Sequence, residues 1–464
     1  MKRSTFTKLL LSTQITMLKK ILLSTLLLLT IVIAAALYIN YPKLTIISSY
    51  AAKKMCSCTF IAERTQESIQ NEDLAMGPLA FSSTTIDREN KKVTSSVFGM
   101  KAKTAEYRGK LGCVLIQGKD NYKVKYPESK NLITDLPDIN YPYGDKVEIL
   151  KTTGIDHDQV QKIVNNAFDD NGGMTSKRTR AVVVLHKDSL IYEQYADGYD
   201  ADTEILGWSM TKSIMNAWVG MLVKDSVLSL DNKNLFPEWA NDDRKEITLN
   251  NLMQMSSGLE WSEIYSKISP ATKMLYDSED NAKVARQLGL EAKVGEHWEY
   301  SSGTTNIISG YIRNQFQNHD DYLRFPYERI FSKLNMDNTT MECDESGTYI
   351  GSSYCYATPR DWARFGTLYL IDGVWNGERL LPEGWVEYTK TIVPDSGGKY
   401  GAQFWTNGGG AMYPDAPHTM FSCNGYEGQL VAIIPSKDLV IVRMGLNSGF
   451  DFNGLLSGIC GAVN

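Results

Sequence analysis

The sequence predicts a mixed α/β (α+β) protein, in which an antiparallel sheet is flanked by helices and accompanied by a mainly helical subdomain. Residues 180–185 and 190–195 have strand-like composition on either side of Lys187-Asp188, which predicts a β-hairpin. Helical spacing of apolar residues dominates the region from about 235 to 390. Further strand-like segments follow at 403–405, 429–435 and 439–444. Strands on both sides of a helical region favour one sheet that the last strands of the chain complete.

The length of 464 residues suits one large catalytic domain with an extension. We expect an N-terminal membrane segment at 1–40, an extension at 41–145 and the catalytic domain at 146–464. Strand-like runs at 93–98 and 112–117 lie in the extension, and its end is marked by Pro137, Pro142 and Gly144, with a helix predicted at 156–171. The net charge of −6 argues against a nucleic-acid partner, for which a basic surface is expected. A small molecule is the expected substrate, and the oligomeric state is left open.

The N-terminus has the composition of an export signal. Residues 21–39 contain no charged side chain and follow directly on Lys19-Lys20, so the run is long enough to cross a bilayer. It is either an uncleaved anchor or a signal that is cleaved near Ala34-Ala35-Ala36. We therefore expect an inner-membrane protein whose catalytic domain is periplasmic, or a periplasmic or secreted protein after cleavage. Met17 is a second candidate for the initiator residue.

The seven cysteines are interpreted together with that export signal. An oxidising compartment permits disulfides, and we expect Cys56 or Cys58 to pair with Cys113. The odd number leaves at least one free thiol. Neither the cysteines nor the histidines have the spacing of a metal site, so no metal and no cofactor are expected.

A Ser-x-x-Lys segment indicates the chemistry. Ser209 and Lys212 lie in a stretch whose apolar residues, among them Ile214 and Trp218, follow helical spacing, so the two side chains share one face of an amphipathic helix. A lysine can remove the proton of a serine hydroxyl only if burial or nearby cations lower its pKa. The start of the helix adds N–H groups and partial positive charge where an oxyanion forms.

A second Ser-x-x-Lys segment occurs at Ser396 and Lys399. The two residues between them are Gly397 and Gly398, which disfavour a helix, so the side chains have no reason to face each other. We interpret this segment as a solvated turn.

Five segments occur in a fixed order along the chain: 207–213 (Gly-Trp-Ser-Met-Thr-Lys-Ser), 252–261 (Leu-Met-Gln-Met-Ser-Ser-Gly-Leu-Glu-Trp), 300–306 (Tyr-Ser-Ser-Gly-Thr-Thr-Asn), 356–366 (Tyr-Ala-Thr-Pro-Arg-Asp-Trp-Ala-Arg-Phe-Gly) and 425–429 (Gly-Tyr-Glu-Gly-Gln). With these segments the chain resembles the class C β-lactamase-like serine hydrolases, most closely the branch of the 6-aminohexanoate-dimer hydrolases and related esterases. The resemblance covers roughly residues 150–464. It implies a β-lactamase/DD-peptidase-like fold.

The resemblance also implies roles for residues. Ser209 is the nucleophile, Lys212 its base, and Tyr300 the group that passes the proton to the leaving group. Ser302 stands where the family usually has asparagine. The backbone N–H groups of Ser209 and Gln429 are expected to form the oxyanion hole. Tyr426, Glu427 and Gly428 stand where β-lactamases carry Lys-Thr-Gly, and together with Ser302 they are the expected substrate-binding residues.

These residues predict an exported serine hydrolase that cleaves a small linear amide or ester through an acyl-enzyme on Ser209. Because Tyr426 replaces the lysine that would hold a penicillin carboxylate, we expect little β-lactamase activity. One alternative is a D-Ala-D-Ala peptidase or β-lactamase acting on cell-wall chemistry. The other is a penicillin-binding-like sensor that is acylated, or docks a peptide, without turnover.

Overall fold

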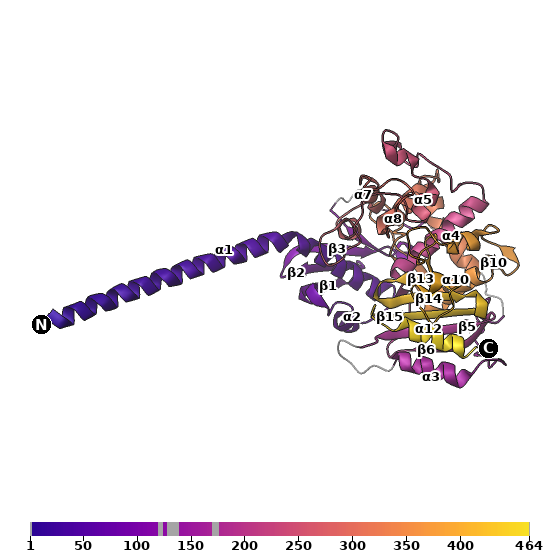
Figure 1. Ribbon diagram of the computed structural model, residues 1–464, viewed down its shortest axis with the longest axis horizontal. Helices are drawn as coiled ribbons and strands as arrows, with labels where there is room; N and C mark the ends of the chain where they lie inside the picture. Colours follow the sequence, from indigo (N-terminus) through magenta and orange to yellow (C-terminus); the bar gives the residue numbers. More distant parts are fainter. Residues whose placement is uncertain (1, 119–123, 128–138, 169–175, 464) are drawn as a thin grey trace.

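The computed structural model describes residues 2–118, 124–127, 139–168 and 176–463. Figure 1 shows a body of sheets and helices from which the helix α1 (Lys2–Phe60) projects. The helix predicted at 156–171 corresponds to α3 (His157–Phe168). Its last predicted residues, 169–171, and the expected boundary residue Pro137 lie outside the described residues.

The largest sheet has six antiparallel strands in the order β12-β13-β14-β15-β5-β6. Their bounds are β5 (Thr179–His186), β6 (Ser189–Tyr195), β12 (Trp405–Thr406), β13 (Phe421–Gly425), β14 (Gln429–Ile434) and β15 (Leu439–Gly445). The predicted hairpin and the predicted strands at 429–435 and 439–444 are therefore confirmed. Strand β13 was not predicted, because Phe-Ser-Cys-Asn-Gly shows neither alternation nor a run of β-branched residues.

Alternate residues of the central strands enter two different hydrophobic cores. Val183 of β5 packs into the core that contains α10 (Pro359–Leu370), whereas Val182 and Val184 pack toward α3 and α12 (Phe452–Gly461). Successive side chains of a strand point to opposite faces, so helices cover the sheet on both sides. Strands β14 and β15 are consequently buried along their whole length.

The middle of the chain is mainly helical, as predicted. Its helices are α4 (Thr211–Lys224), α5 (Leu249–Met253), α6 (Pro270–Tyr276), α7 (Asn281–Arg286), α8 (Ser302–Arg313), α9 (His319–Pro326) and α11 (Trp385–Lys390). Two small sheets accompany them, β7-β9-β8 and β10-β11. Their strands are β7 (Ile205–Leu206), β8 (Thr339–Met341), β9 (Cys355–Ala357), β10 (Val374–Trp375) and β11 (Glu378–Arg379).

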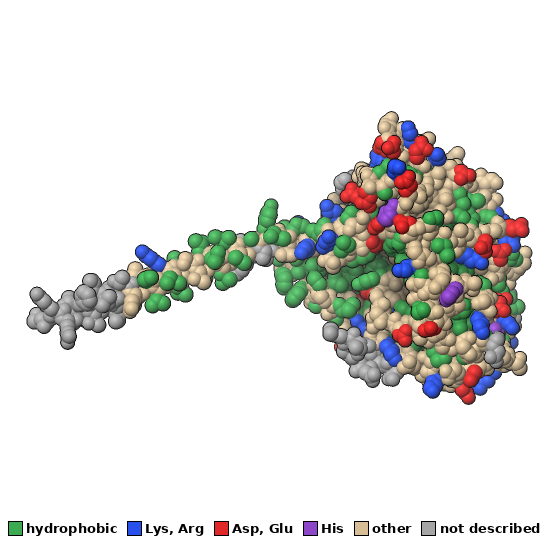
Figure 2. Space-filling view, viewed as in Figure 1, with side chains coloured by type: hydrophobic (Ala, Val, Ile, Leu, Met, Phe, Trp, Pro, Cys, Tyr) green, Lys and Arg blue, Asp and Glu red, His purple; other side chains and the backbone are tan. Residues whose placement is uncertain are grey.

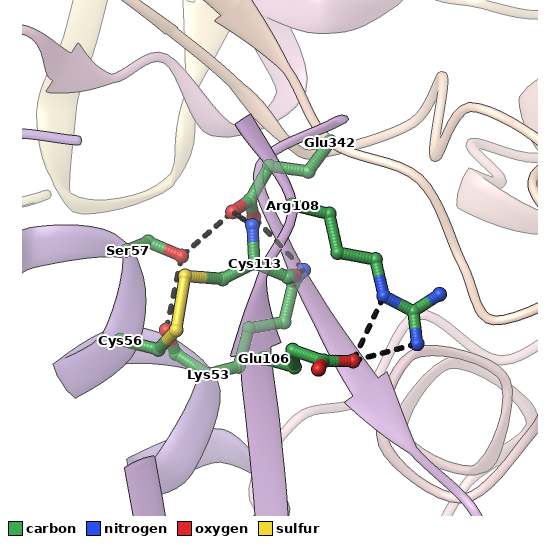
Figure 3. Close-up of a disulfide and its surroundings, with 7 residues drawn as sticks. All are labelled: Lys53, Cys56, Ser57, Glu106, Arg108, Cys113 and Glu342. Atoms are coloured by element: carbon green, nitrogen blue, oxygen red, sulfur yellow. Dashed lines mark hydrogen bonds and ion pairs between the residues drawn. A yellow bond between two sulfur atoms is a disulfide. The ribbon is translucent and has the colours of Figure 1, made fainter. Parts of the chain in front are cut away.

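The extension forms a four-stranded antiparallel sheet that packs on the C-terminal part of α1. Its elements are α2 (Gln66–Glu72), β1 (Ser82–Asp87), β2 (Lys92–Val97), β3 (Met100–Tyr107) and β4 (Cys113–Ile116). A disulfide joins Cys56 of α1 to Cys113 of β4, which confirms one of the two predicted pairings (Figure 3). Cys58 and the remaining four cysteines are free and buried.

Buried charged side chains connect this extension to the rest of the molecule. Glu342, which follows β8, accepts hydrogen bonds from Ser57 Oγ and from the backbone N–H of Cys113, both at 2.7 Å (Figure 3). Lys53 Nζ lies 2.8 Å from the other oxygen of the Glu342 carboxylate. A buried carboxylate needs such compensation, so the disulfide region and β8 are held in one arrangement.

The N-terminal part of α1 stands apart from the body. Apolar side chains described between residues 17 and 39 are largely exposed, and Figure 2 shows them in green along the projecting helix. In the part of the chain that the structure describes, none of the helices combines the length and the hydropathy of a membrane span. The membrane segment predicted at 21–39 has no support from this result and stays a prediction.

Candidate active site

Ser209 lies on a tight turn between β7 and α4. Gly207 donates its backbone N–H to the Cys355 carbonyl of β9 at 2.9 Å, and the Thr211 hydroxyl donates to the Trp208 carbonyl at 2.7 Å. Trp208, the residue before the nucleophile, has a φ of +49°, in the left-handed region that non-glycine residues rarely adopt. Such backbone strain is held in place only by surrounding contacts, and it is common at functional sites.

Only glycine fits at position 207. A Cβ atom there would lie 2.3 Å from the ring of Trp362, which is buried in α10. The backbone at Gly207 therefore packs closely against α10, directly after β7. Two residues later, Ser209 lines a cavity at the beginning of α4.

Lys212 lies beneath Ser209 and is 1 % exposed. Its Nζ donates to Ser209 Oγ at 3.0 Å, to Ser302 Oγ at 3.0 Å and to the Ser352 carbonyl at 2.9 Å. Desolvation lowers the pKa of Lys212 to about 8, so about a tenth of the amine is neutral at pH 7 and about half at pH 8. The neutral amine can accept the Ser209 proton across the same contact.

Helix α4 differs from the amphipathic helix that we predicted. Its residues from Thr211 to Leu222 are buried on every side. A helix enclosed all round belongs to the core of a large domain. This enclosure is the reason for the desolvation of Lys212.

Tyr300 lines the cavity beside the Ser209–Lys212 pair. Its ring centroid lies 5.0 Å from Lys212 Nζ, and the ring packs against Trp405 at 5.0 Å and Tyr400 at 5.8 Å. Desolvation raises the pKa of Tyr300 well above its usual range, although a hydrogen bond with Ser209 opposes the change. The phenol is therefore protonated at neutral pH and can donate a proton.

Glu263 is a member of this network that the sequence did not reveal. It accepts from Ser302 Oγ at 2.5 Å, from the Ser302 backbone N–H at 2.9 Å and from Trp261 Nε1 at 2.5 Å. Its charge acts against desolvation by raising the pKa of Lys212. Glu263 lies two positions after the 252–261 segment, and no spacing in the sequence connects it with Lys212.

Ser302 is completely buried and contacts Lys212 and Glu263. We expected it to bind substrate, but it is not among the residues that line the cavity. Ser302 instead joins the base to the carboxylate that influences its pKa. It supplies the hydroxyl where the family usually has asparagine.

The turn between β13 and β14 contains the other expected substrate-binding residues. Tyr426 is 52 % exposed, lines the cavity, and its ring meets that of Trp208 edge-on at 5.6 Å. Glu427 also lines the cavity but is buried, and it accepts a hydrogen bond from Trp208 Nε1 at 2.9 Å. Lys54 Nζ of α1 lies 3.9 Å from the same carboxylate oxygen. Glu427 therefore stabilises the nucleophile turn and is already paired within the protein.

Gly428 and Gln429 follow this turn and contact other parts of the protein. Gly428 has a φ of +81°, and a Cβ there would lie 2.3 Å from the Asn447 carbonyl oxygen. Gln429 pairs with Gly425 across the hairpin, and its side-chain amide donates to the Gly445 carbonyl at 2.6 Å. Neither residue lines the cavity, whereas Asn424 and Gly425 of β13 do. The structure thus brings β13, which we did not predict, to the site.

The second Ser-x-x-Lys segment is part of a turn. Ser396 Oγ donates to the Val393 carbonyl at 2.7 Å, and Ser396 is buried. Neither Ser396 nor Lys399 lines the cavity around Ser209.

Among the described residues, no group of three or more His, Cys, Asp or Glu side chains could hold a metal ion.

The cavity has a volume of about 680 Å³ and a largely apolar surface. Six aromatic side chains of the catalytic domain line it: Trp208, Tyr265, Tyr276, Tyr300, Trp405 and Tyr426. A serine held against a buried lysine, with a protonated tyrosine at the wall of one cavity, defines a serine hydrolase of the Ser-x-x-Lys type.

Comparison with known proteins agrees with this class. A family model described as "Beta-lactamase" matches residues 164–446, and the chain belongs to this family. A 6-aminohexanoate-dimer hydrolase of Paenarthrobacter ureafaciens is 24% identical over 312 residues, which cover 61% of this chain and 76% of that protein.

Two solved structures share the fold. A Bacillus anthracis protein, provisionally named a 6-aminohexanoate-dimer hydrolase, is 24% identical with a TM-score of 0.54, covering 64% of this chain and 80% of that one. A mutant class C β-lactamase is 13% identical with a TM-score of 0.52, covering 68% of this chain and all of the other. The predicted β-lactamase/DD-peptidase-like fold is confirmed.

The lowered pKa of Lys212 predicts how activity depends on pH. Because the base acts when neutral, kcat/KM should rise with pH and level off above about 8. Glu263→Gln removes a charge that raises the pKa of Lys212, so the inflection should move to lower pH. The measurement is kcat/KM for a soluble ester between pH 5 and pH 10.

Glu260→Gln is the matched control, since Glu260 is exposed and lies near Glu263 in the sequence. It should leave the inflection unchanged. An inflection that stays in place in Glu263→Gln would contradict the coupling between Glu263 and the titrating base.

Proposed function

We propose that this serine hydrolase cleaves a small linear amide or ester through an acyl-enzyme on Ser209. The observation that carries the proposal is the 3.0 Å contact between Ser209 Oγ and Lys212 Nζ, whose pKa is lowered to about 8. This contact opens onto an apolar cavity large enough for an organic substrate.

In acylation, Ser209 Oγ attacks the carbonyl carbon while Lys212 accepts its proton. Tyr300 donates its phenolic proton to the departing amine or alcohol and is reprotonated from Lys212. Water then attacks the acyl-enzyme, Lys212 accepts the proton of that water, and the acid leaves as Ser209 Oγ is protonated again.

The oxyanion needs two N–H donors. We assign the first to the backbone of Ser209, at the start of α4. For the second we replace Gln429, which lies on β14 away from the cavity, by a backbone N–H of β13 at Asn424 or Gly425. Gly425 lies close to the nucleophile turn, since a Cβ there would be 2.1 Å from the Gly207 carbonyl oxygen.

The relatives named as 6-aminohexanoate-dimer hydrolases support a linear amide as substrate. A D-Ala-D-Ala peptidase or β-lactamase is the second candidate, favoured by the shared fold. Against it, the residue at the expected lysine position is Tyr426, which lines the cavity and offers a neutral hydroxyl. A sensor that is acylated without turnover would release one leaving group per protein and then stop.

We also propose that the chain is exported and that residues 21–39 act as the signal or anchor. The uncharged run after Lys19-Lys20 and its exposed apolar side chains support this. The Cys56–Cys113 disulfide supports an oxidising compartment for residues 41–464.

Ser209→Ala should abolish both hydrolysis and labelling by a fluorophosphonate, because Ser209 contacts Lys212 at the cavity, whereas Ser302, which also contacts Lys212, does not line the cavity. Peptide mass spectrometry of the labelled protein is the measurement. Ser396→Ala is the control and should change neither, since its hydroxyl is bound within a turn. Label found on Ser396 would contradict the assignment.

Esters should be hydrolysed well and a chromogenic cephalosporin little or not at all. Tyr426→Lys should raise cephalosporin acylation roughly tenfold to a hundredfold, because a charge-assisted contact to a carboxylate is worth about 1.5–3 kcal/mol. Glu427 is left intact, since it is bonded to Trp208. If the unmodified protein hydrolyses the cephalosporin faster than p-nitrophenyl butyrate, the cell-wall alternative is favoured.

Export predicts the side of the membrane on which the C-terminus lies. A reporter that is active only in the periplasm, fused after Asn464, should be active. The matched control deletes residues 1–40 and should abolish the reporter signal while the fusion is still produced. A fusion that is active only as a cytoplasmic reporter would contradict the proposal.

A further inference from the structure

The extension, which precedes the matched family segment, forms a wall of the catalytic cavity. Lys43, Ile46, Ile47 and Tyr50 line it. Their intervals of three and four residues place them on one face of α1. Leu79, in the short helix at Gly77–Phe81, lines the same side. All of these residues lie before residue 164, where the family match begins.

This wall packs against the turn that carries the nucleophile. The Tyr50 ring stacks on Trp208 at 6.2 Å with an interplanar angle of 22°, and it meets Tyr276 at 5.4 Å. Lys54, one turn further along α1, lies 3.1 Å from Asp73 and 3.9 Å from Glu427. The extension and the nucleophile turn therefore share one packed interface.

Apart from Lys43, the side chains of the wall are mainly apolar. Ile46, Ile47 and Leu79 contribute hydrocarbon, and Figure 2 shows green side chains gathered where α1 meets the body. Glu427 and Asp73, which also line the cavity, are paired with Lys54. An apolar surface of this kind gains most from a ligand that transfers methylene groups out of water.

We infer that this wall binds the acyl chain of the substrate, so that the preferred substrates are esters or amides of medium- or long-chain acids. The inference rests on the proposed acyl-enzyme at Ser209 and specifies its substrate class. The carbonyl lies at Ser209 and Tyr300, and the chain extends toward Ile46, Ile47 and Leu79.

The first test is the chain-length profile of the full-length protein. The substrates are p-nitrophenyl acetate, butyrate, hexanoate and octanoate at concentrations at which each is monomeric. Each methylene that enters the cavity should raise kcat/KM by about fourfold at most, and octanoate should exceed acetate at least about tenfold. This comparison needs no variant, so it does not depend on how a substitution folds.

The second test asks whether the increase of kcat/KM with chain length depends on the extension. Ile47→Ser and Leu79→Ser should each lower kcat/KM for octanoate about fivefold while acetate changes less than about twofold. Val227→Ser removes an exposed apolar residue that does not line the cavity and should leave the profile unchanged.

The outcomes separate the inference from the proposed function. Ser209-dependent acetate hydrolysis with a flat or falling chain-length profile would overturn the acyl-chain site and leave the proposed function standing. A rising profile that Ile47→Ser and Leu79→Ser leave unchanged would also overturn it. If no ester is turned over in a Ser209-dependent manner, both fail.

Discussion

The contact between buried Lys212 and Ser209 is the interaction on which the rest of the site depends. An amine with its ordinary pKa would be almost fully protonated near neutral pH and could not act as the base. Enclosure of α4 on every side changes this, because desolvation penalises the charged form. The hydroxyls and the carbonyl around Nζ give the amine partners, so its burial does not leave it without hydrogen bonds.

Glu263 partly offsets the effect of burial on the pKa of Lys212. Its carboxylate reaches Lys212 through Ser302 and raises the pKa that desolvation lowers. The balance leaves the amine near the protonation midpoint at mildly alkaline pH, where a base both accepts and returns a proton readily. Tyr300 complements it, because its raised pKa keeps the phenol as a donor. The surroundings of Lys212 and Tyr300 therefore make the lysine the base and the tyrosine the acid.

The extension contributes to the site in two ways. Tyr50 and Lys54 of α1 contact Trp208 and Glu427, which hold the strained turn before the nucleophile. Ile46 and Ile47, on the same helix, complete the cavity. The extension is held in place by the Cys56–Cys113 disulfide and by the buried Glu342 contacts, so its position relative to Ser209 does not rest on surface contacts alone.

The sequence by itself determined the local features. Hairpin β5–β6, strands β14 and β15 and the pairing of serine with lysine follow from periodicity and spacing over a few residues. The resemblance supplied Tyr300 because family motifs record which distant segments meet. Tertiary structure alone decided the contacts of Glu263 and Glu427, the presence of β13 at the cavity, and the wall formed by α1. These depend on contacts between residues that are far apart in the chain, and neither local propensity nor motif spacing encodes such contacts.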